Sequence, residues 1–311
     1  MFSKTIDFFV ISCYNVFDKK ITKSKGEPKM KVYVITGGGS GMGLATVREL
    51  GKDAKIIISG RTASKLESAV AELTAEGYNV EAYSCDVSDR ASVKALAEYA
   101  ASQGEVVGLI HAAGVSPHMG NAETITKINA LGTLYADEEF FKVMKEGSII
   151  INVSSMSAYM LPGALLPTGK YGLIFKDEEK FLKAMVGRAK LFGEKMESNL
   201  GYPISKNFVC WLTKRLANRY YLEKKIRIIS VSPGNFETPM GNLESDQGAQ
   251  FVVNNAIQRF GNVEEIAVLF AHLCDPRLGY LTGTDIVCDG GCIGNLATYS
   301  KKEQKEFKFH N

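Results

Sequence analysis

Tyr202 and Lys206 are the residues of this chain whose types and spacing could most directly move a proton. They lie four positions apart in a stretch with helical apolar periodicity, so both side chains are predicted to project from one helix face. A tyrosine hydroxyl is a poor acid or base at neutral pH because its ordinary pKa is about 10, and a nearby ammonium group lowers that pKa by stabilising the phenolate. The pair could therefore exchange a proton with a substrate oxygen, although the same spacing is common on ordinary helix surfaces.

A glycine-rich turn at residues 36–43 could bind phosphate. It reads T-G-G-G-S-G-M-G and falls between a predicted strand and a predicted helix. Gly37 permits the tight turn, Gly41 lets the backbone approach a pyrophosphate, and Gly43 allows close packing of the helix, whose N-terminus faces the negative charge. A tight turn that binds no ligand is the alternative interpretation. The cofactor contacts predicted in this turn are Thr36, Gly37, Ser40, Gly41, Met42 and Gly43.

The segments that must position these residues alternate between short β-branched runs and helix-length amphipathic stretches, which is typical of βαβ units on a parallel sheet. We predict strands at residues 32–35, 55–59, 80–84, 107–112, 147–153, 226–231 and 285–288. We predict helices at residues 43–50, 63–76, 90–102, 125–144, 202–221 and 263–274. The predicted fold class is therefore α/β, a Rossmann-type doubly wound sheet of seven parallel strands with helices on both faces.

One segment interrupts this alternation after the fifth strand. Residues 161–200 separate that strand from the next helix, and a connection of this length is uncommon unless it is functional. Its middle, residues 177–191, begins with acidic side chains and has apolar residues at helical spacing. We therefore predict a helical insertion that forms either a lid over the substrate or a subunit interface.

The domain pattern begins at Met30 and divides the chain into three parts. They are an N-terminal extension (1–29), one dinucleotide-binding domain (30–294) that contains the insertion, and a C-terminal tail (295–311). The extension has a short apolar patch at residues 8–11 but no small-residue cleavage site, which favours a flexible segment or an upstream start codon over a signal peptide. A short amphipathic membrane contact is the remaining alternative.

Composition disfavours several classes of partner. The 37 basic and 34 acidic residues give a formal charge of +3 and are interspersed, so nucleic acid is not expected to bind. No apolar run is long enough to span a membrane. The six cysteines are scattered, with no C-x-x-C pair and no Cys/His cluster at zinc spacing, so we expect no metal site and a cytoplasmic location.

Seven further motifs follow the glycine-rich turn along the chain. They are Asp86-Val87, His111-Ala112-Ala113-Gly114, Asn129-Ala130-Leu131-Gly132, Ser154-Ser155, Tyr202-x-x-x-Lys206, Pro233-Gly234 with Thr238, and Asp289-Gly290-Gly291. Together with the turn, this ordered series resembles the short-chain dehydrogenase/reductase family over residues 30–294. The resemblance implies an oxidoreductase that transfers a hydride between nicotinamide and a carbonyl or an alcohol.

The resemblance also implies a role for each matching residue. Tyr202 is expected to give its proton to the carbonyl oxygen, or to act as base in the reverse direction, while Lys206 also holds the nicotinamide ribose. Ser155 is expected to hydrogen-bond the substrate oxygen, with Ser154 as the less favoured candidate. Asn129 is expected to hold a water of a proton relay, or alternatively to be a buried polar residue satisfied by nearby backbone. The other implied cofactor contacts are Asp86 and Val87 beside the adenine, Thr238 at the nicotinamide carboxamide, and Ala113, Gly114, Pro233 and Gly234.

The end of the second predicted strand favours NADP(H) over NAD(H). NAD enzymes of this kind usually carry an acidic residue there that binds the ribose hydroxyls, whereas this chain has Gly60 followed by Arg61. A guanidinium can form charge-assisted hydrogen bonds with a 2′-phosphate, which a carboxylate would repel. Alternatively Arg61 points into solvent, and Ser40 stands where some NADP-binding relatives carry a basic residue.

The chain departs from the family pattern in two places. Ala112 replaces an asparagine that braces the central strands, and His111 is expected to be structural or close to the cofactor rather than a general base. Ser155 and Tyr202 are 47 positions apart, counted from their residue numbers, which is much longer than usual. The insertion and the stretch 232–239 resemble the 3α-hydroxysteroid dehydrogenase/carbonyl reductase branch, in which the insertion rearranges the subunit interface, so we expect a homo-oligomer of altered geometry.

We therefore predict a carbonyl reductase or hydroxysteroid-dehydrogenase-like enzyme that acts on a small hydrophobic carbonyl or alcohol substrate. Apolar side chains after the catalytic serine would suit a substrate pocket, or alternatively the core or an interface. They are Met156, Tyr159, Met160, Leu161, Leu165 and Leu166. A β-ketoacyl carrier-protein reductase is expected to lack the insertion, and an enoyl reductase to space tyrosine and lysine more widely. A non-catalytic NADP(H)-binding sensor would not need the set Asn129, Ser155, Tyr202 and Lys206.

Overall fold

A sheet of seven parallel strands forms the centre of the computed structural model, which describes residues 29–238, 252 and 255–298. The strand order is β3-β2-β1-β4-β5-β6-β7. The strands are β1 Lys31–Thr36, β2 Lys55–Gly60, β3 Val80–Ser84, β4 Glu105–His111, β5 Ile149–Val153, β6 Arg227–Pro233 and β7 Asp285–Cys288. The predicted fold class is confirmed, and each predicted strand is present with its bounds shifted by two residues at most.

The central strands are continuous apolar runs because both faces of the sheet are covered. All five residues of β5 are buried, as are Ile57 and Ile58 of β2. Successive side chains point to opposite faces, so Ile57 and Ile150 belong to one core cluster while Ile58 and Ile151 belong to the other. Side chains of one strand therefore contribute alternately to two separate cores, one on each face of the sheet.

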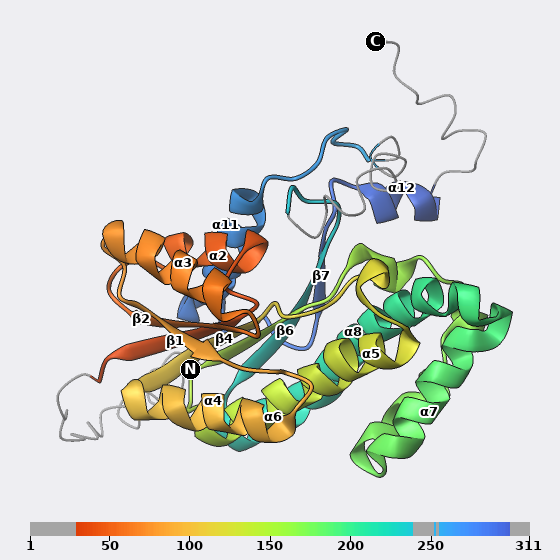
Figure 1. Cartoon of the computed structure of the whole chain (residues 1–311), viewed down its shortest axis with the longest axis horizontal. Helices are drawn as coiled ribbons and strands as arrows, with labels where there is room; N and C mark the ends of the chain where they lie inside the picture. The colour runs from red at the N-terminus through yellow and green to blue at the C-terminus, as the bar shows by residue number, and fades with distance from the viewer. Residues whose placement is uncertain (1–28, 239–251, 253–254, 299–311) are drawn as a thin grey trace, which may run out of the picture.

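Helices cover the two faces of the sheet (Figure 1). On one face lie α2 Gly41–Glu49, α3 Ala63–Ala75 and α11 Val263–Leu273. On the other lie α4 Arg90–Gln103, α6 Gly132–Val143 and α8 Glu197–Lys224, with α5 Ala122–Thr126 and α7 Glu178–Ala189 beside α8. A short helix that we did not predict, α12 Cys292–Thr298, runs past the predicted domain end at residue 294.

The helix predicted at residues 125–144 is divided in the structure. A π-helical turn, Lys127–Leu131, separates α5 from α6, and Asn129 lies within it. Such turns carry one extra residue and occur frequently at functional sites. Residues of this turn are buried, so their apolar pattern runs on without a visible break and the sequence predicts one continuous helix.

Helix α8 begins at Glu197 rather than at the predicted residue 202, and Pro203 therefore lies inside it. Proline is favoured in the first turn of a helix, whereas Pro203 is the seventh residue of α8. The early turns are held by packing, because Leu200 and Gly201 are buried and Gly201 lies against Ala122 of α5. The last residues of the predicted insertion, 161–200, thus belong to the helix that carries Tyr202.

The insertion after β5 packs against the helical layer of the core. The ring of Phe181 in α7 lies 4.8 Å from that of Phe208 in α8, and Tyr171 meets the same ring at 5.3 Å, measured between centroids. At the start of α7, Glu178 forms an ion pair of 3.1 Å with Arg90 of α4. These contacts favour a fixed structural element over a mobile lid.

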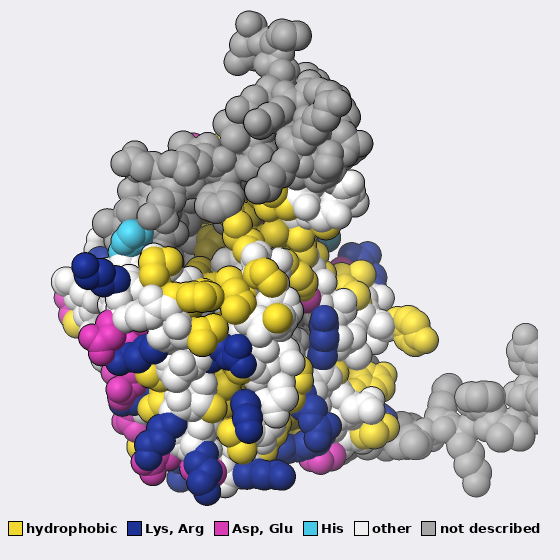
Figure 2. Space-filling view, turned by 90° about the vertical axis from the view of Figure 1, so that its right-hand side faces the viewer, with side chains coloured by type: hydrophobic (Ala, Val, Ile, Leu, Met, Phe, Trp, Pro, Cys, Tyr) yellow, Lys and Arg dark blue, Asp and Glu magenta, His cyan; other side chains and the backbone are white. Residues whose placement is uncertain are grey.

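The side of the molecule that carries α7 presents hydrophobic side chains in its upper part and lysines and arginines in its lower part (Figure 2). At the end of the insertion, Leu191, Phe192 and Met196 are 52, 61 and 43% exposed. Exposed apolar side chains that lie close together are typical of interaction surfaces. The alternative that the insertion forms a subunit interface therefore stays open.

Several predictions fall outside the described residues. These are the N-terminal extension up to residue 28, the tail from residue 299, and Pro239 in the stretch after β6. In the part of the chain that the structure describes, no helix is long and apolar enough to cross a membrane. The same part contains no group of three or more His, Cys, Asp or Glu side chains placed to hold a metal ion.

Candidate active site

The glycine-rich turn joins β1 to α2 at the carboxyl edge of the sheet. Gly37 has a φ of 72°, which favours glycine, and its N–H donates to the carbonyl of Ser59 at 2.7 Å. A side chain at Gly43 would place its Cβ 2.6 Å from the carbonyl oxygen of Gly37. The hydroxyl of Ser40 makes no capping bond at the start of α2, so the first N–H groups of this helix are available to a phosphate.

Thr36 joins the ends of β1 and β4. Its hydroxyl shares a hydrogen bond of 2.9 Å with Nδ1 of His111 and accepts the N–H of Ala113 at 3.2 Å. His111 is buried, and burial together with the charge of Lys206 lowers its pKa to about 3. The ring is therefore neutral at physiological pH and braces the strands where Ala112 cannot, in keeping with the structural role expected for His111.

Five buried polar side chains form one register row across the sheet. Thr36 pairs with Ser59 on one side and with His111 on the other, His111 pairs with Asn152, and Asn152 pairs with Ser230. In-register neighbours of a parallel sheet point to the same face, which here is the face covered by α4, α6 and α8. This row lies at the carboxyl ends of the strands, between the apolar core and the candidate site.

Asn152 extends this row into the helical layer. Its amide donates to Oδ2 of Asp137 at 3.0 Å and to the hydroxyl of Thr213 at 3.2 Å. Asp137 is completely buried, and burial raises its pKa well above the ordinary value. Burial therefore favours the neutral form of this carboxyl group over the charged form. Our reading of the sequence missed this network because its members are far apart along the chain.

Tyr202 and Lys206 project from the same part of α8. Nζ of Lys206 lies 5.9 Å from the centre of the Tyr202 ring and donates to the carbonyl of Val153, the last residue of β5, at 2.9 Å. Burial lowers the pKa of Lys206 to about 8. The structure thus brings the tyrosine, a buried ammonium group and the end of β5 together.

The two serines that follow β5 have different surroundings. Ser154 is buried, and its hydroxyl donates to the carbonyl of Lys206 at 2.8 Å, which ties α8 to the end of β5. Ser155 is partly exposed, and its hydroxyl accepts the N–H of Ser157 at 3.2 Å. Because that bond is accepted, the hydroxyl proton of Ser155 can be donated to a substrate oxygen. The geometry favours Ser155 over Ser154 as the substrate contact.

Asn129 faces the loop that follows β4. Its side chain accepts the N–H of Val115 at 2.9 Å and donates to the carbonyl of Val115 at 3.0 Å and to the hydroxyl of Ser205 at 3.2 Å. A Cβ on Gly114 would lie 3.2 Å from Oδ1 of Asn129 and 3.3 Å from Nζ of Lys206. Asn129 is therefore satisfied by nearby groups, as the alternative interpretation expects, although its Oδ1 and Nζ of Lys206 both lie close to Gly114. Its part in a proton relay stays a prediction.

Pro233 is the last residue of β6, and Gly234 after it lies against the turn that follows β7. A Cβ on Gly234 would lie 2.6 Å from Cα of Asp289. The carboxylate of Asp289 accepts the N–H groups of Gly291 and Ile293 at 2.9 and 2.7 Å. Two motifs that are distant in the sequence therefore brace each other at the edge of the site.

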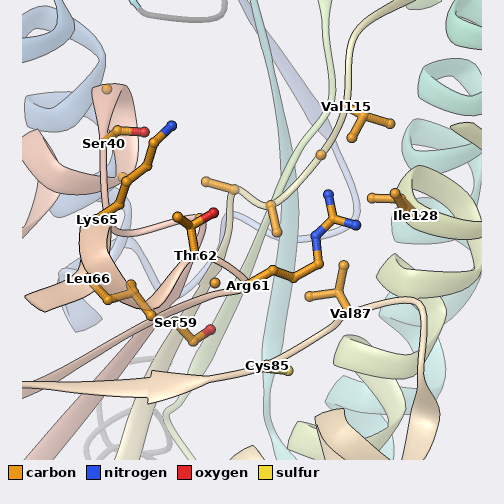
Figure 3. A pocket seen from close by; sticks show the side chains of 18 of the residues that line it. Ser40, Ser59, Arg61, Thr62, Lys65, Leu66, Cys85, Val87, Val115 and Ile128 are labelled. Atoms are coloured by element: carbon orange, nitrogen blue, oxygen red, sulfur yellow. The ribbon is translucent and has the colours of Figure 1, made fainter. Parts of the chain in front are cut away.

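A pocket of about 310 Å³ lies at the carboxyl ends of β1, β2 and β4 (Figure 3). The predicted cofactor contacts that line it are Gly37, Ser40, Gly41, Met42, Gly43, Arg61, Asp86, Val87, Ala113, Gly114 and Thr238. The predicted contacts that are not part of its wall are Thr36, Tyr202, Lys206, Pro233 and Gly234. Sequence reasoning missed Thr62, Lys65 and Leu66, which bring the start of α3 into the wall. The position of Lys65, one helical turn after Arg61, is a signal that could have revealed it.

Comparisons with known proteins agree with this geometry. The model of the family described as short chain dehydrogenase matches residues 31–167, and that described as Enoyl-(Acyl carrier protein) reductase matches residues 187–292. A short-chain dehydrogenase/reductase of Alternaria brassicicola is 29% identical over 269 residues, covering 85% of this chain and 96% of its own. A cyclohexanol dehydrogenase of Acinetobacter sp. (strain SE19) is 29% identical over 262 residues, covering 84% and 94%.

Solved structures have the same fold. A short-chain dehydrogenase/reductase from Serratia marcescens superposes with a TM-score of 0.67 at 26% identity, covering 85% of this chain and 98% of its own. A short chain dehydrogenase from Burkholderia cenocepacia, solved in complex with NADP, has a TM-score of 0.67 at 22% identity, covering 84% and 97%. At the latter identity the likeness concerns the fold alone.

Proposed function

Because the chain belongs to the short-chain dehydrogenase/reductase family, we propose that it interconverts a ketone and a secondary alcohol with NADP(H). The family makes it an oxidoreductase that acts on a CH–OH or carbonyl group with NAD(P). The observation that carries the proposal is the placement of Tyr202 next to buried Lys206 and the end of β5, beside a pocket formed by the glycine-rich turn.

The turn and the pocket suit a dinucleotide. Gly37 and Gly43 let the backbone close so tightly that a Cβ at either position would lie within 3 Å of a backbone atom, and a pyrophosphate can approach that surface. Asp86 and Val87 line the part of the wall proposed for the adenine, and Thr238 the part for the carboxamide. When bound, the nicotinamide supplies or accepts the hydride.

Residues of α8 and of the segment after β5 would transfer the proton and bind the substrate oxygen. Tyr202 donates its hydroxyl proton to the carbonyl oxygen during reduction, and the positive charge of Lys206 stabilises the phenolate that remains. Ser155 donates a hydrogen bond to the same oxygen and polarises the carbonyl group. In the alcohol-oxidising direction, the Tyr202 phenolate takes the proton back.

The end of β2 supports a preference for NADP(H). Gly60 occupies the place where a carboxylate would repel a 2′-phosphate, and Arg61 lines the pocket directly after it. Two positively charged side chains, Arg61 and Lys65, are part of the described wall, against the single carboxylate of Asp86. This balance favours the cofactor with the additional phosphate.

The substrate is proposed to be a cyclic hydrophobic ketone or its alcohol. Not all apolar residues after Ser155 are free to line a substrate site: Met156 is buried, and Leu161 and Leu166 pack against the core. Tyr159 donates its hydroxyl to Asp285 at 2.6 Å. The relationship to a protein named cyclohexanol dehydrogenase supports a cyclic secondary alcohol, and the packed helical insertion supports the proposed likeness to the hydroxysteroid dehydrogenase/carbonyl reductase branch.

The test is a fluorescence titration with NADPH and NADH, followed by nicotinamide absorbance with cyclic, steroidal and carrier-linked acyl ketones. We expect tighter binding of NADPH and turnover of a cyclic ketone. Turnover of acyl thioesters alone would favour the β-ketoacyl reductase alternative. No feature of the described residues supports that alternative specifically. Tight binding with no turnover of any ketone or alcohol would favour the sensor alternative.

A further inference from the structure

Two positively charged side chains flank the wall of the cofactor pocket at the start of α3. Arg61 follows β2 directly, and Lys65 lies in the first turn of α3, four residues later. Both side chains are exposed, and neither forms an ion pair with a residue of the described ranges. Lys65 is therefore available to a ligand in the pocket, whereas the charge of Arg61 also acts on Asp86: after the hydrogen bonds from Ser88, it helps to lower the pKa of that carboxyl.

The two cations point to different parts of that pocket (Figure 3). The amine of Lys65 lies beside the hydroxyl of Ser40, at the end formed by the glycine-rich turn. The guanidinium of Arg61 extends the other way, toward the apolar side chains of Val87, Val115 and Ile128. An ammonium group is a compact partner for a phosphate, whereas a planar guanidinium also stacks on an aromatic ring.

Two hydroxyl groups belong to the same side of the pocket wall as Lys65. Ser40 and Thr62 are the N-cap residues of α2 and α3, and both have the extended backbone of a cap, but neither side chain makes the capping hydrogen bond. A serine or threonine at this position usually makes that bond, which contributes about 1 kcal/mol to helix stability. Both hydroxyls line the pocket, so each can donate to a ligand oxygen.

One oxygen of the single carboxylate in the described wall is engaged within its own turn. Oδ1 of Asp86 accepts the N–H of Ser88 at 2.9 Å and its hydroxyl at 2.7 Å. The part of the pocket between Ser40, Thr62 and Lys65 therefore combines one positive charge with two free hydroxyls. The positive charge makes that combination a better partner for an anionic phosphate monoester than for the uncharged hydroxyls of a ribose.

We propose that Lys65, with Ser40 and Thr62, recognises the 2′-phosphate of NADP(H), while Arg61 covers the adenine ring. The inference rests on the proposed NADP(H) function and adds a division of labour between the two cations. Discrimination between the two cofactors is then set mainly by Lys65, and Arg61 contributes to the binding of both.

The experiment compares Lys65→Met, Arg61→Met and Lys170→Met by titration with NADPH, NADH, adenosine 2′,5′-bisphosphate and 5′-AMP. The control, Lys170, is also exposed and lies in the insertion, away from the pocket wall, so its variant removes the same charge without touching the site. We expect Lys65→Met to weaken NADPH and the bisphosphate by roughly tenfold or more, as for loss of a charge-assisted hydrogen bond. The binding of NADH and 5′-AMP should be unchanged. Arg61→Met should weaken all four ligands.

Three results would overturn the proposal, and each one excludes a different part of it. Equal weakening of NADPH and NADH by Lys65→Met would place Lys65 at the pyrophosphate. An unchanged preference in Lys65→Met with a lost preference in Arg61→Met would return the 2′-phosphate to Arg61 and leave the NADP(H) proposal intact. Equal binding of NADPH and NADH by the unmodified protein would overturn both proposals.

Discussion

Lys206 is buried at the point where α8 meets β5, and this burial makes its charge sensitive to pH. Removal from water disfavours the ammonium form and lowers the pKa of Lys206 to about 8, although the ammonium group donates a hydrogen bond to the Val153 carbonyl. Below that pH the side chain is charged and can stabilise the Tyr202 phenolate; above it the side chain becomes neutral. We expect kcat/KM for NADPH in ketone reduction, which reports groups of the free enzyme, to fall as pH rises through about 8. A profile that stays flat through this pH would contradict the role of Lys206.

Tyr202→Phe keeps the ring and removes the proton. We expect turnover to fall by about 100-fold or more, the usual contribution of general acid catalysis, while NADPH binds as before. Stopped-flow turnover and a fluorescence titration on the same sample separate the two effects. Undiminished turnover would overturn the catalytic assignment, and the loss of both properties would point to a folding defect.

Ser154 and Ser155 allow a matched comparison of adjacent residues. Ser155→Ala should lower turnover, because its hydroxyl proton can be donated to the substrate. Its bond from the Ser157 N–H is long and only partly buried, so the loss of stability should be smaller than in Ser154→Ala. Ser154→Ala should instead lower the free energy of unfolding by about 1 kcal/mol, the net value of its bond to the Lys206 carbonyl, while turnover is largely kept. Urea unfolding and steady-state kinetics on both variants test this, and the reverse pattern would exchange the two roles.

At the scale of elements, the π-helical turn and the insertion both contact the helical layer that carries the catalytic pair. The turn Lys127–Leu131 directs Asn129 toward the loop after β4 and, through Ser205, toward α8. The insertion buries Tyr171, Phe181 and Met185 against the helical layer that carries the catalytic pair. Both elements thus act on the position of α8.

Phe181→Ala tests whether the insertion is part of the core. Phe181 is fully buried against Phe208, so its truncation should lower the free energy of unfolding by about 3–5 kcal/mol in a single cooperative transition. Phe192→Ala is the matched control, because that ring is 61% exposed and its loss should change stability by only about 0.5 kcal/mol. A lid would behave differently: Phe181→Ala would then raise KM and leave stability nearly unchanged.

At the scale of the whole molecule, the site combines residues that are far apart in the described chain, from Gly37 to Thr238, on one edge of the sheet. The turn after β1, the start of α3, the loop after β4 and Thr238 after β6 all contribute to one pocket. A ligand that bridges these segments binds the folded chain and not the unfolded one. Cofactor binding must therefore stabilise the entire domain.

NADPH at 100 times its dissociation constant should raise the free energy of unfolding by about 2.7 kcal/mol. NADH at the same concentration should raise it less if the 2′-phosphate is recognised. Thermal unfolding followed by circular dichroism measures both shifts, and sedimentation of the same samples measures the mass of the expected homo-oligomer. Identical shifts with the two cofactors would contradict the proposed preference for NADP(H).

The sequence by itself determined the succession of strands and helices along the chain, the glycine-rich turn and the Tyr202–Lys206 pair. These features follow from local rules: side-chain periodicity sets the elements, Gly37 and Gly43 are required by a backbone that closes within a few residues, and two side chains four apart share a helix face. Such rules act over short stretches, so they can be read without knowing the fold.

Only the tertiary structure decided what depends on long-range contact. Three such contacts join segments that are far apart in the chain. They are the hydrogen bond of His111 with Thr36, the placement of Lys65 beside Ser40, and the bond of Ser154 to Lys206 that distinguishes it from Ser155. The π-helical turn is hidden for the same reason, because burial of its last four residues weakens the periodicity that would reveal it. Packing between distant elements sets burial, and burial sets the charge of His111 and Lys206, which is why their chemistry emerged only from the folded chain.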